Sequence, residues 1–238
     1  MKVEIWSDVM CPFCYIGKRH FEQALETLPF KNEITVEWKS FQLNPEYKNT
    51  SGESLYEYLA KSKGISVEQA KAMTSQVAGM ANAAGLKIDF AHNIPANSFN
   101  AHRIIHLAAK HSLQDKAEEA FFNAHFVQNL DVDKPDVLLQ VATEIGLDKD
   151  ETAALLSGDE FADAVRYDQY EAQNLGIRGV PYFVLDRKYG ISGAQPVDMF
   201  TQALTQSFTE WKATQPQTKL TSLGSQNGAN CDENGCAL

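Results

Sequence analysis

The chain has 238 residues, a net charge of −10 at pH 7 and a hydrophobic fraction of 44%. A chain of this length and composition can bury a full core without disulfide staples. Its acidic balance argues against nucleic acid or an anionic membrane as the main partner, because phosphate groups would be repelled. No apolar run approaches the ~18 residues that span a bilayer. We therefore expect a soluble globular protein.

The N-terminal stretch MKVEIWSDVM carries charges and a tryptophan, where a secretory signal peptide has about 7–15 apolar residues. We therefore expect a cytoplasmic location. Cysteines in that reducing compartment are more often catalytic or metal-binding than structural. The four cysteines form two close pairs at opposite ends of the chain, Cys11 with Cys14 and Cys231 with Cys236.

The order of predicted elements begins with a strand over residues 3–7, which alternate in the β style. The CPFC motif follows, and residues 15–28 show an apolar stripe at helical spacing. Residues 34–43 alternate again and predict a second strand. A right-handed crossover would make the two strands parallel.

The following hundred residues carry little β character and predict a block of helices, after which strands return. Residues 181–186 and 189–192 predict a hairpin, and residues 197–211 predict a closing helix. The predicted helices before the hairpin lie near residues 53–62, 66–84, 98–112, 114–128, 134–145, 148–156 and 159–174, with starts marked by Ser66 and by Asp133 ahead of Pro135.

These elements predict an α/β protein with a thioredoxin-like fold and a helical domain inserted after the second strand. Residues 1–47 and 158–211 would form the thioredoxin-like domain, and residues 48–157 the inserted helical domain. Residues 212–238 are mostly small and polar, a composition typical of a flexible tail.

The CPFC motif lies at a strand-to-helix junction, where it favours redox chemistry. Thiol–disulfide exchange needs a thiolate, and a helix N-terminus at Cys11 supplies unpaired N–H groups and the positive end of the helix dipole. Pro12 suits the first helical position. Cys11 would attack the substrate disulfide, and Cys14, one helical turn further on, would resolve the mixed disulfide that forms. A zinc half-site and two incidental thiols are the alternatives, and the amphipathic helix that follows favours exchange.

The segment Gly179-Val180-Pro181-Tyr182-Phe183 is the second element of the predicted site. By itself it indicates a strand that begins at a proline. Combined with the N-terminal CxxC, Pro181 suggests the cis-proline that faces the active disulfide in thioredoxin folds. The backbone of Val180 would then be free to pair with an extended substrate peptide.

Five segments carry a family resemblance: SDVMCPFCYIGKRHFE (7–22), SFQLNP (40–45), NSFNAHR (97–103), GVPYFV (179–184) and ISGAQP (191–196). With them the chain resembles the FrnE-like branch of the DsbA family, cytoplasmic relatives of the periplasmic dithiol oxidases. The resemblance implies an oxidoreductase acting on protein or peptide disulfides, with a role in oxidative-stress protection.

The same fold branch includes 2-hydroxychromene-2-carboxylate isomerases and kappa-class glutathione transferases, which carry Ser at the first active-site position. Cys11 stands there in this chain, which favours redox exchange; a glutathione-dependent isomerase or transferase is kept as the alternative. A module that senses metal or stress with all four cysteines is a third hypothesis. We expect no cofactor beyond the redox-active disulfide and no resident metal. Glutathione or a thioredoxin-type protein is the candidate reductant.

Further candidates surround the predicted dithiol. Pro12 and Phe13 fall within the motif, where Phe13 would be exposed, and Val180, Ser192 and Gln195 form the candidate surface for glutathione or a substrate thiol. Asp8 would modulate the pKa of the thiols or carry a proton. The sequence fits equally well with Asp8 being a carboxylate on a surface loop. The family likeness places His102 and Arg103 near the cleft between the domains, whereas their ordinary role would be packing or capping in the insertion.

The tail pair Cys231 and Cys236 lies behind a polar tether whose stretched limit is near ~65 Å. The tail could therefore reach the CPFC site at an effective concentration up to the millimolar range. Asp232 and Glu233 would raise the pKa values of the tail thiols by charge repulsion. We expect a relay in which electrons pass from the tail dithiol to Cys11 and Cys14; bystander cysteines or metal binding are the alternatives.

The relay predicts that the double variant Cys231→Ser/Cys236→Ser has altered turnover and an altered redox potential at the CPFC dithiol. Turnover in a disulfide-exchange assay and the potential measured against a glutathione buffer would check this. An unchanged turnover with an unchanged potential would exclude the relay.

Overall fold

The computed structural model describes residues 1–48, 52–215, 231–232 and 235–236. Its centre is a four-stranded sheet with the order β2–β1–β3–β4. β1 (Lys2–Ser7) and β2 (Thr35–Ser40) are parallel, with Ser7 opposite Ser40 at their ends. β3 (Tyr182–Leu185) runs antiparallel to β1 and forms a hairpin with β4 (Tyr189–Ser192). β1 is thus an inner strand, and the chain leaves its end directly into the CPFC motif.

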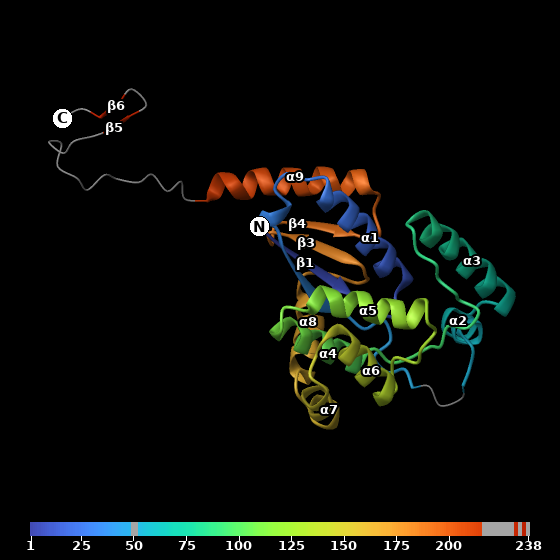
Figure 1. Ribbon diagram of the computed structural model, residues 1–238. Helices are drawn as coiled ribbons and strands as arrows, with labels where there is room; N and C mark the ends of the chain where they lie inside the picture. Colours follow the sequence, from blue (N-terminus) through green and yellow to red (C-terminus); the bar gives the residue numbers. More distant parts are fainter. Residues whose placement is uncertain (49–51, 216–230, 233–234, 237–238) are drawn as a thin grey trace.

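Helices cover both faces of this sheet (Figure 1). α1 (Pro12–Glu26) and α9 (Val197–Thr214) pack on one face through an aromatic cluster in which Phe183 lies 5.5 Å from Phe21 and 4.6 Å from Phe200, between ring centroids. α8 (Ala162–Asn174) covers the other face, where the fully buried Trp6 donates from Nε1 to the Asp168 carbonyl at 2.9 Å. The motif helix α1 is therefore fixed on a rigid support.

Between β2 and α8, the described residues form six helices. The hairpin of α2 and α3 projects from the body in Figure 1 and packs on α1 and α5 through a cluster that includes Tyr15, Val77 and Phe126. The other four helices enclose a separate apolar core that reaches Val9 in the loop before Cys11. The six are α2 (Leu55–Lys63), α3 (Val67–Ala83), α4 (Phe99–Lys110), α5 (Gln114–Phe126), α6 (Pro135–Ile145) and α7 (Lys149–Ser157).

The predicted fold class is confirmed: the protein is α/β, with a thioredoxin-type sheet and helices inserted after the second strand. Ser66 is the N-cap of α3 as expected, because the Ser66 and Gln69 side chains each accept a hydrogen bond from the other's backbone amide. The start of α6 differs from the prediction, since its N-cap is Lys134 and not Asp133. α9 ends at Thr214, beyond the predicted end at residue 211. Among the described residues, no helix has the length and apolar character needed to cross a bilayer.

At the chain end, the short strands β5 (Cys231–Asp232) and β6 (Gly235–Cys236) pair antiparallel, with Cys231 opposite Cys236 in the backbone register. Residues 216–230, the greater part of the predicted tether, lie outside the described residues. The domain boundaries and the tail's reach to the CPFC site stay predictions.

At Gly17, α1 packs closely against Pro181 and the turn that follows β4. A Cβ at Gly17 would lie 3.0 Å from Pro181 Cγ and 3.5 Å from Ala194 Cα. A side chain there would therefore push α1, and the cysteines on its first turn, away from this loop. Gly79, on α3, offers a matched comparison because a Cβ there meets nothing within 4 Å.

We expect Gly17→Val to lower the free energy of unfolding by about 1–3 kcal/mol, the usual effect of overpacking. Gly79→Ala should raise it by up to about 1 kcal/mol through helix propensity alone. Urea unfolding of both variants would check this. A Gly17→Val protein as stable as the wild type would show that α1 and the Pro181 loop are not in tight contact.

Candidate active site

Cys11 stands at the N-cap of α1, with extended backbone angles (φ −100°, ψ 110°), and Pro12 begins the helix. Its carbonyl accepts from the amide of Cys14 at 3.0 Å, and its own amide donates to the Asp8 carbonyl at 2.9 Å. The first turn of α1 holds no acidic residue. The positive end of the helix dipole is thus unopposed by charge on α1 where the Cys11 sulfur lies.

The loop that carries Pro181 faces this cysteine. The Val180–Pro181 peptide bond is cis, as expected from Pro181 in combination with the N-terminal CxxC. Cys11 Sγ lies 3.6 Å from the Val180 carbonyl oxygen and donates to it. Cys11 and Cys14 are both free thiols, and their residues are 3% and 1% exposed. The structure therefore brings together the three residues that the sequence predicted as catalytic.

The two thiols differ in their surroundings. Burial raises the pKa of the Cys14 thiol well above its ordinary value, and the adjacent Cys11 sulfur raises it further. A hydrogen bond with the Asp8 backbone lowers the pKa of Cys14 but does not cancel these effects. Cys14 is therefore a protonated thiol at neutral pH. Cys11 is the thiol placed between the Val180 carbonyl and an open cleft.

Asp8 is buried and is not a surface carboxylate. Its Oδ1 accepts from the Met10 amide at 3.2 Å, and its Oδ2 accepts from the Leu43 amide at 2.7 Å. His102 Nε2 lies 3.5 Å from Asp8 Oδ1 and also donates to the Phe41 carbonyl at 3.1 Å. Burial lowers the pKa of His102, but the hydrogen bond and charge of Asp8, together with the charges of Glu118 and Asp168, outweigh this effect and raise the pKa. Asp8 and His102 thus form a buried pair directly behind the cysteine loop.

Arg103 has no part in this pair. Its guanidinium donates to the carbonyls of Leu155 and Gly158 at 2.6 Å each, and to that of Glu160 at 2.9 Å. It therefore ties α4 to the end of α7 and the segment that follows. The interpretation of Arg103 as a packing and capping residue matches its contacts.

Glu118, on α5, is a member of the buried cluster that sequence reasoning missed. Ser7 Oγ, at the end of β1, donates to Glu118 Oε1 at 2.5 Å. Burial raises the pKa of Glu118 to about 7, although the charge of His102, the Ser7 hydroxyl and the charge of Lys18 all oppose this. A glutamate within a polar stretch of helix carries no sign of burial in the sequence, because its partner Ser7 is more than a hundred residues away.

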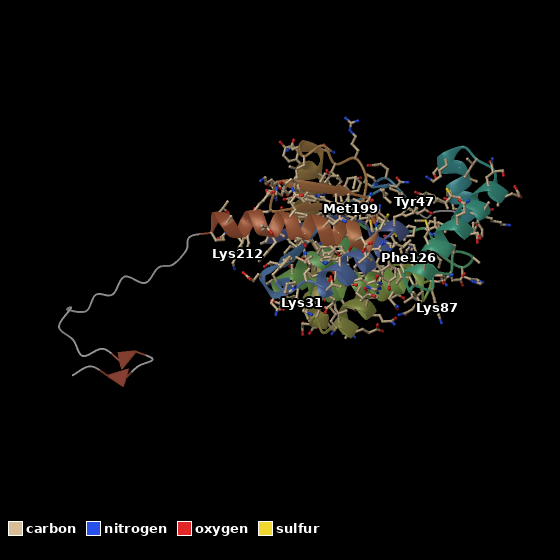
Figure 2. The ribbon with its side chains drawn as sticks, turned by 90° about the horizontal axis from the view of Figure 1, so that it is seen from above. Lys31, Tyr47, Lys87, Phe126, Met199 and Lys212 are labelled. Atoms are coloured by element: carbon tan, nitrogen blue, oxygen red, sulfur yellow. The ribbon has the colours of Figure 1, made fainter. Side chains whose placement is uncertain are left out.

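An apolar cleft of about 510 Å³ opens beside Cys11, between the CPFC loop and the α2–α3 hairpin. Phe13, 38% exposed, lies at this cleft. Figure 2 shows Phe126, another lining residue, where the body of the protein meets the hairpin. Apolar and polar side chains both contribute to the rest of the lining. The apolar ones are Met10, Pro12, Leu43, Leu55, Leu59, Met73, Val77, Phe90, Pro95 and Ala96, and the polar ones are Asp8, Asn44, Tyr58, Ser62, Lys63, Thr74, Asn93, Ser98 and His125. The cleft gives Cys11 a neighbouring surface that suits an apolar group.

The remaining candidates, Ser192 and Gln195, lie on the Pro181 side of the site. The Gly193 amide donates to the Pro181 carbonyl at 2.8 Å, which holds the turn after β4 against the cis-proline loop. Gln195 Nε2 donates to the Ser192 carbonyl at 2.8 Å, and the Gln195 carbonyl contacts His20 Nδ1 at 2.8 Å. Both residues therefore belong to the turn that is held against the cis-proline loop, and neither is among the residues that line the apolar cleft.

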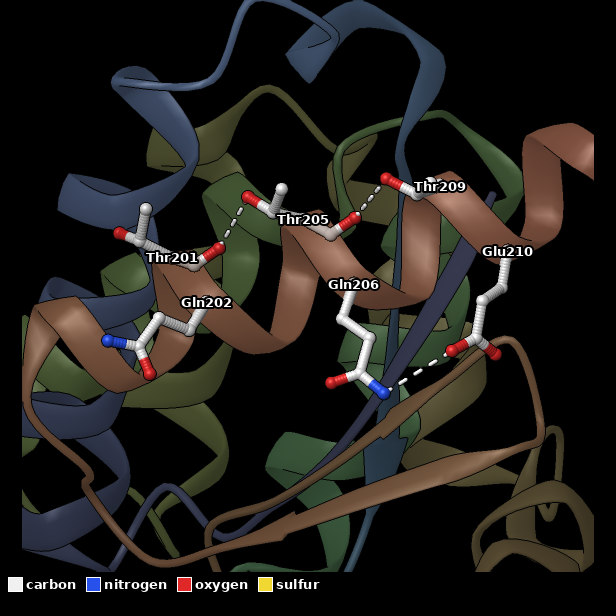
Figure 3. A pocket seen from close by; sticks show the side chains of 6 residues that line it. All are labelled: Thr201, Gln202, Thr205, Gln206, Thr209 and Glu210. Carbon is white, nitrogen blue, oxygen red and sulfur yellow. Dashed lines mark hydrogen bonds between the residues drawn. The ribbon is translucent and has the colours of Figure 1, made fainter.

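A second hollow runs along the outer face of α9 and is lined by Thr201, Gln202, Thr205, Gln206, Thr209 and Glu210 (Figure 3). The hydroxyls of Thr205 and Thr209 bond back to carbonyls of the same helix at 2.7 and 2.8 Å. This surface offers no nucleophile or buried polar group, so the candidate site is the one at Cys11. Within the described part of the chain, no cluster of three or more His, Cys, Asp or Glu side chains is arranged to hold a metal ion.

The fold and the dithiol facing a cis-proline define a thioredoxin-fold protein with a CxxC centre. Residues 2–205 match the DSBA-like thioredoxin domain family, and the chain belongs to that family. The crystal structure of a probable DsbA oxidoreductase from Streptomyces coelicolor is 37% identical, with a TM-score of 0.84 over 100% of this chain and 99% of that one.

Two further relatives are more distant. The uncharacterized protein YwbO of Bacillus subtilis is 27% identical over 85% of this chain and 95% of its own length. The cytosolic disulfide reductase DsbM of Pseudomonas aeruginosa is 16% identical, with a TM-score of 0.62 over 88% of this chain and 100% of that one. At this identity the likeness to DsbM is one of fold.

The raised pKa of Glu118 predicts a pH dependence of stability. The unfolded chain loses this proton near pH 4.5 and the folded protein near pH 7, so the folded state binds more protons between these values. Stability should therefore fall as pH rises through this window, by up to about 3 kcal/mol. Glu118→Gln, which keeps an acceptor for Ser7, should have a smaller loss of stability between pH 5 and pH 8.

Urea unfolding at pH 5 and pH 8 would measure this difference. Glu119→Gln is the matched control, because the pKa of Glu119 is lowered: burial raises it, but the Arg19 hydrogen bond and the Lys18 charge outweigh this. The pH dependence of stability that Glu119 causes is therefore confined to pH values below 5. Equal pH slopes for the wild type and Glu118→Gln would contradict the assignment of a buried, neutral-pH carboxyl.

Proposed function

We propose that this protein is a dithiol–disulfide oxidoreductase of the FrnE-like branch, acting on protein or peptide disulfides in the cytoplasm. The observation that carries the proposal is the placement of Cys11 at the N-cap of α1, 3.6 Å from the Val180 carbonyl that precedes cis-Pro181, with buried Cys14 one turn behind. A role in oxidative-stress protection follows from the same assignment.

In the proposed reaction, the Cys11 thiolate attacks one sulfur of the substrate disulfide. The substrate S–S bond breaks, a mixed disulfide forms at Cys11, and the other substrate sulfur leaves as a thiolate that takes up a proton. Cys14 then loses its proton and attacks Cys11 Sγ, which releases the second substrate thiol. The substrate gains two electrons and two protons, and Cys11 and Cys14 end as a disulfide. The reverse sequence transfers a disulfide to a substrate dithiol.

Asp8 is the candidate acceptor for the proton of Cys14, because its carboxylate is buried and its charge acts on that thiol. His102, 3.5 Å from Asp8, would stabilise the carboxylate between turnovers. Both residues would thus modulate the resolving step, while Pro12 and Phe13 would contact the substrate. Val180 would pair with the substrate backbone, as extended peptides do with an exposed strand edge.

Glutathione or a thioredoxin-type protein would return the Cys11–Cys14 disulfide to the dithiol. Ser192 and Gln195, beside the cis-proline loop, form the candidate surface for this reductant. The relay from the Cys231–Cys236 pair belongs to the same proposal. A cytosolic disulfide reductase among the structural relatives is compatible with a reductive role in the cytoplasm.

The proposal predicts that the wild-type protein reduces insulin with glutathione as the electron source. Cys11→Ser should lose at least about a hundredfold in rate, because it removes the nucleophile. Cys14→Ser should form the mixed disulfide and stall, so that a covalent adduct accumulates on mass spectra. Melting curves of both variants control for folding. A Cys11→Ser protein that reduces insulin at the wild-type rate would refute the proposal.

A glutathione-dependent isomerase or transferase is the second candidate, favoured by the apolar cleft of about 510 Å³ at Cys11, which falls in the size range of small-molecule sites. This candidate uses one sulfur and needs no resolving thiol. It therefore expects activity on a small aromatic substrate to survive in Cys14→Ser, whereas the oxidoreductase expects turnover to stop there.

A further inference from the structure

Glu118, on the inserted helix α5, is a buried carboxyl whose partner suits both of its charge states. The residue is 1% exposed, and Ser7 Oγ, at the end of β1, donates to Glu118 Oε1 at 2.5 Å. A hydroxyl both donates and accepts, so the Ser7 hydroxyl can turn and accept a hydrogen bond once Glu118 is protonated. Glu118 can therefore take up and release a proton while it stays buried.

Two other buried carboxylates in this part of the molecule are held in their ionised state. Asp8 accepts from two backbone amides. Asp168 accepts from the Ser40 amide at 2.9 Å and pairs with Lys39 at 3.2 Å. Amide and ammonium groups only donate, so they favour a carboxylate over a protonated carboxyl. Glu118 differs from both in the chemistry of its partner, which makes it the carboxyl suited to store a proton.

Glu118 interacts electrostatically with the groups behind the dithiol. His102 Nε2 lies 3.5 Å from Asp8 Oδ1. The charge of Asp8 acts on Cys14, on His102 and on Glu118, and the charges of His102 and Glu118 act on each other. Burial raises the pKa of Glu118 to about 7, so both of its charge states are populated near neutral pH. Asp8, His102 and Glu118 thus form one buried acid–base cluster.

Charged and titratable groups from the neighbouring elements face this acid–base cluster. His106 Nε2, one turn beyond His102 on α4, lies 3.1 Å from Asp168 Oδ2. The groups that act on the cluster are Lys18 of α1 at Glu118, Asp168 of α8 at His102, and His125 of α5 at Asp8. All of them are retained in the variants used below, so a difference in pH dependence between those variants and the wild type reports on Glu118.

The resolving step of the proposed reaction needs an acceptor for a proton. Cys14 must lose its proton while the substrate is still joined to Cys11. Cys14 is 1% exposed, so water has little access to its sulfur. A group of the protein therefore has to take the proton before the thiolate can attack.

We propose that Glu118 is the proton store of the resolving step: the acid–base cluster takes up the proton of Cys14, which comes to rest on the Glu118 carboxylate. The Cys14 S–H bond breaks, the bond between the two cysteine sulfurs forms, and the substrate sulfur leaves Cys11 with the electron pair of the broken S–S bond. Glu118 then returns the proton to water. The inference rests on the proposed function, because only a two-cysteine exchange has a resolving step.

The test follows both halves of one turnover in the full chain. Reduced protein is mixed with an equal amount of dithiobis(nitrobenzoate), whose coloured thiolate is released once by the attack of Cys11 and once by the attack of Cys14. Stopped-flow absorbance gives the rate of each release between pH 5 and pH 9. In the wild type, we expect the second release to rise with pH through an inflection near pH 7, because only the ionised Glu118 can accept a proton.

Glu118→Gln should lose this inflection and slow the second release at pH 8 at least about tenfold, with the first release unchanged. Glu119→Gln is the matched control, since the Glu119 carboxylate is bound by Arg19, and it should keep both rates and the inflection. Ser7→Ala removes a hydroxyl that lowers the pKa of Glu118, so its inflection should move to higher pH. Melting curves control for folding, and Ser7→Ala keeps the test valid if Glu118→Gln does not fold.

A Glu118→Gln protein with the wild-type inflection would overturn the proton store, and so would an equal slowing of its two releases. An inflection that Ser7→Ala leaves unmoved would overturn it as well. A wild type that releases the coloured thiolate only once has no resolving step, which would refute the proposed function. Two releases with the same pH profile in the wild type and every variant would refute the proton store and leave the proposed function intact.

Discussion

The buried carboxylate of Asp8 is the constraint on which the arrangement of the site depends. In the short loop between β1 and α1 it accepts hydrogen bonds from the amides of Met10 and Leu43, and its carbonyl accepts from Cys11. One residue thus fixes the direction in which α1 leaves the sheet. The same residue ties the loop before α1 to the segment after β2. Because buried carboxylates are tolerated only when they are well bonded, the loop has little freedom to move Cys11 away from Val180.

The same carboxylate links the dithiol to the inserted helices. Asp8 faces His102 on α4, and Ser7, its neighbour in the chain, bonds to Glu118 on α5. The insertion therefore supplies the charged and titratable groups behind the cysteines, while the sheet supplies the cysteines themselves. The charge of Asp8 acts on Cys14, His102 and Glu118 alike, so that a change of protonation at one group is felt by the others.

The insertion has a second role on the other side of Cys11, where the α2–α3 hairpin closes the apolar cleft. Sequence patterns predicted both helices of the hairpin and the cap of α3 at Ser66, because capping and periodicity act over a few residues. They could not predict that Val77, Met73 and Phe13 line one cleft, since these residues are far apart in the chain. For the same reason, the sequence could not show which of the predicted modulators lie together. Asp8 and His102 form a pair, whereas Arg103 donates to a carbonyl after α7.

The sequence by itself determined the order of strands and helices, the helical insertion, and the pair of Cys11 and Cys14 with Pro181 as their partner. The elements and the cysteine pair rest on local rules: apolar periodicity, the preference of proline for the first helical turn, and the chemistry of two thiols one turn apart. The partnership with Pro181 rests on the likeness to thioredoxin folds, since its segment by itself indicates only the start of a strand. Only the tertiary structure decided that Asp8 is buried, that burial raises the pKa of Glu118 to about 7 beside Ser7, and that the α2–α3 hairpin and the CPFC loop line one cleft. The physical reason is that burial and charge pairing are set by residues distant in the chain, and no local pattern encodes which of them meet.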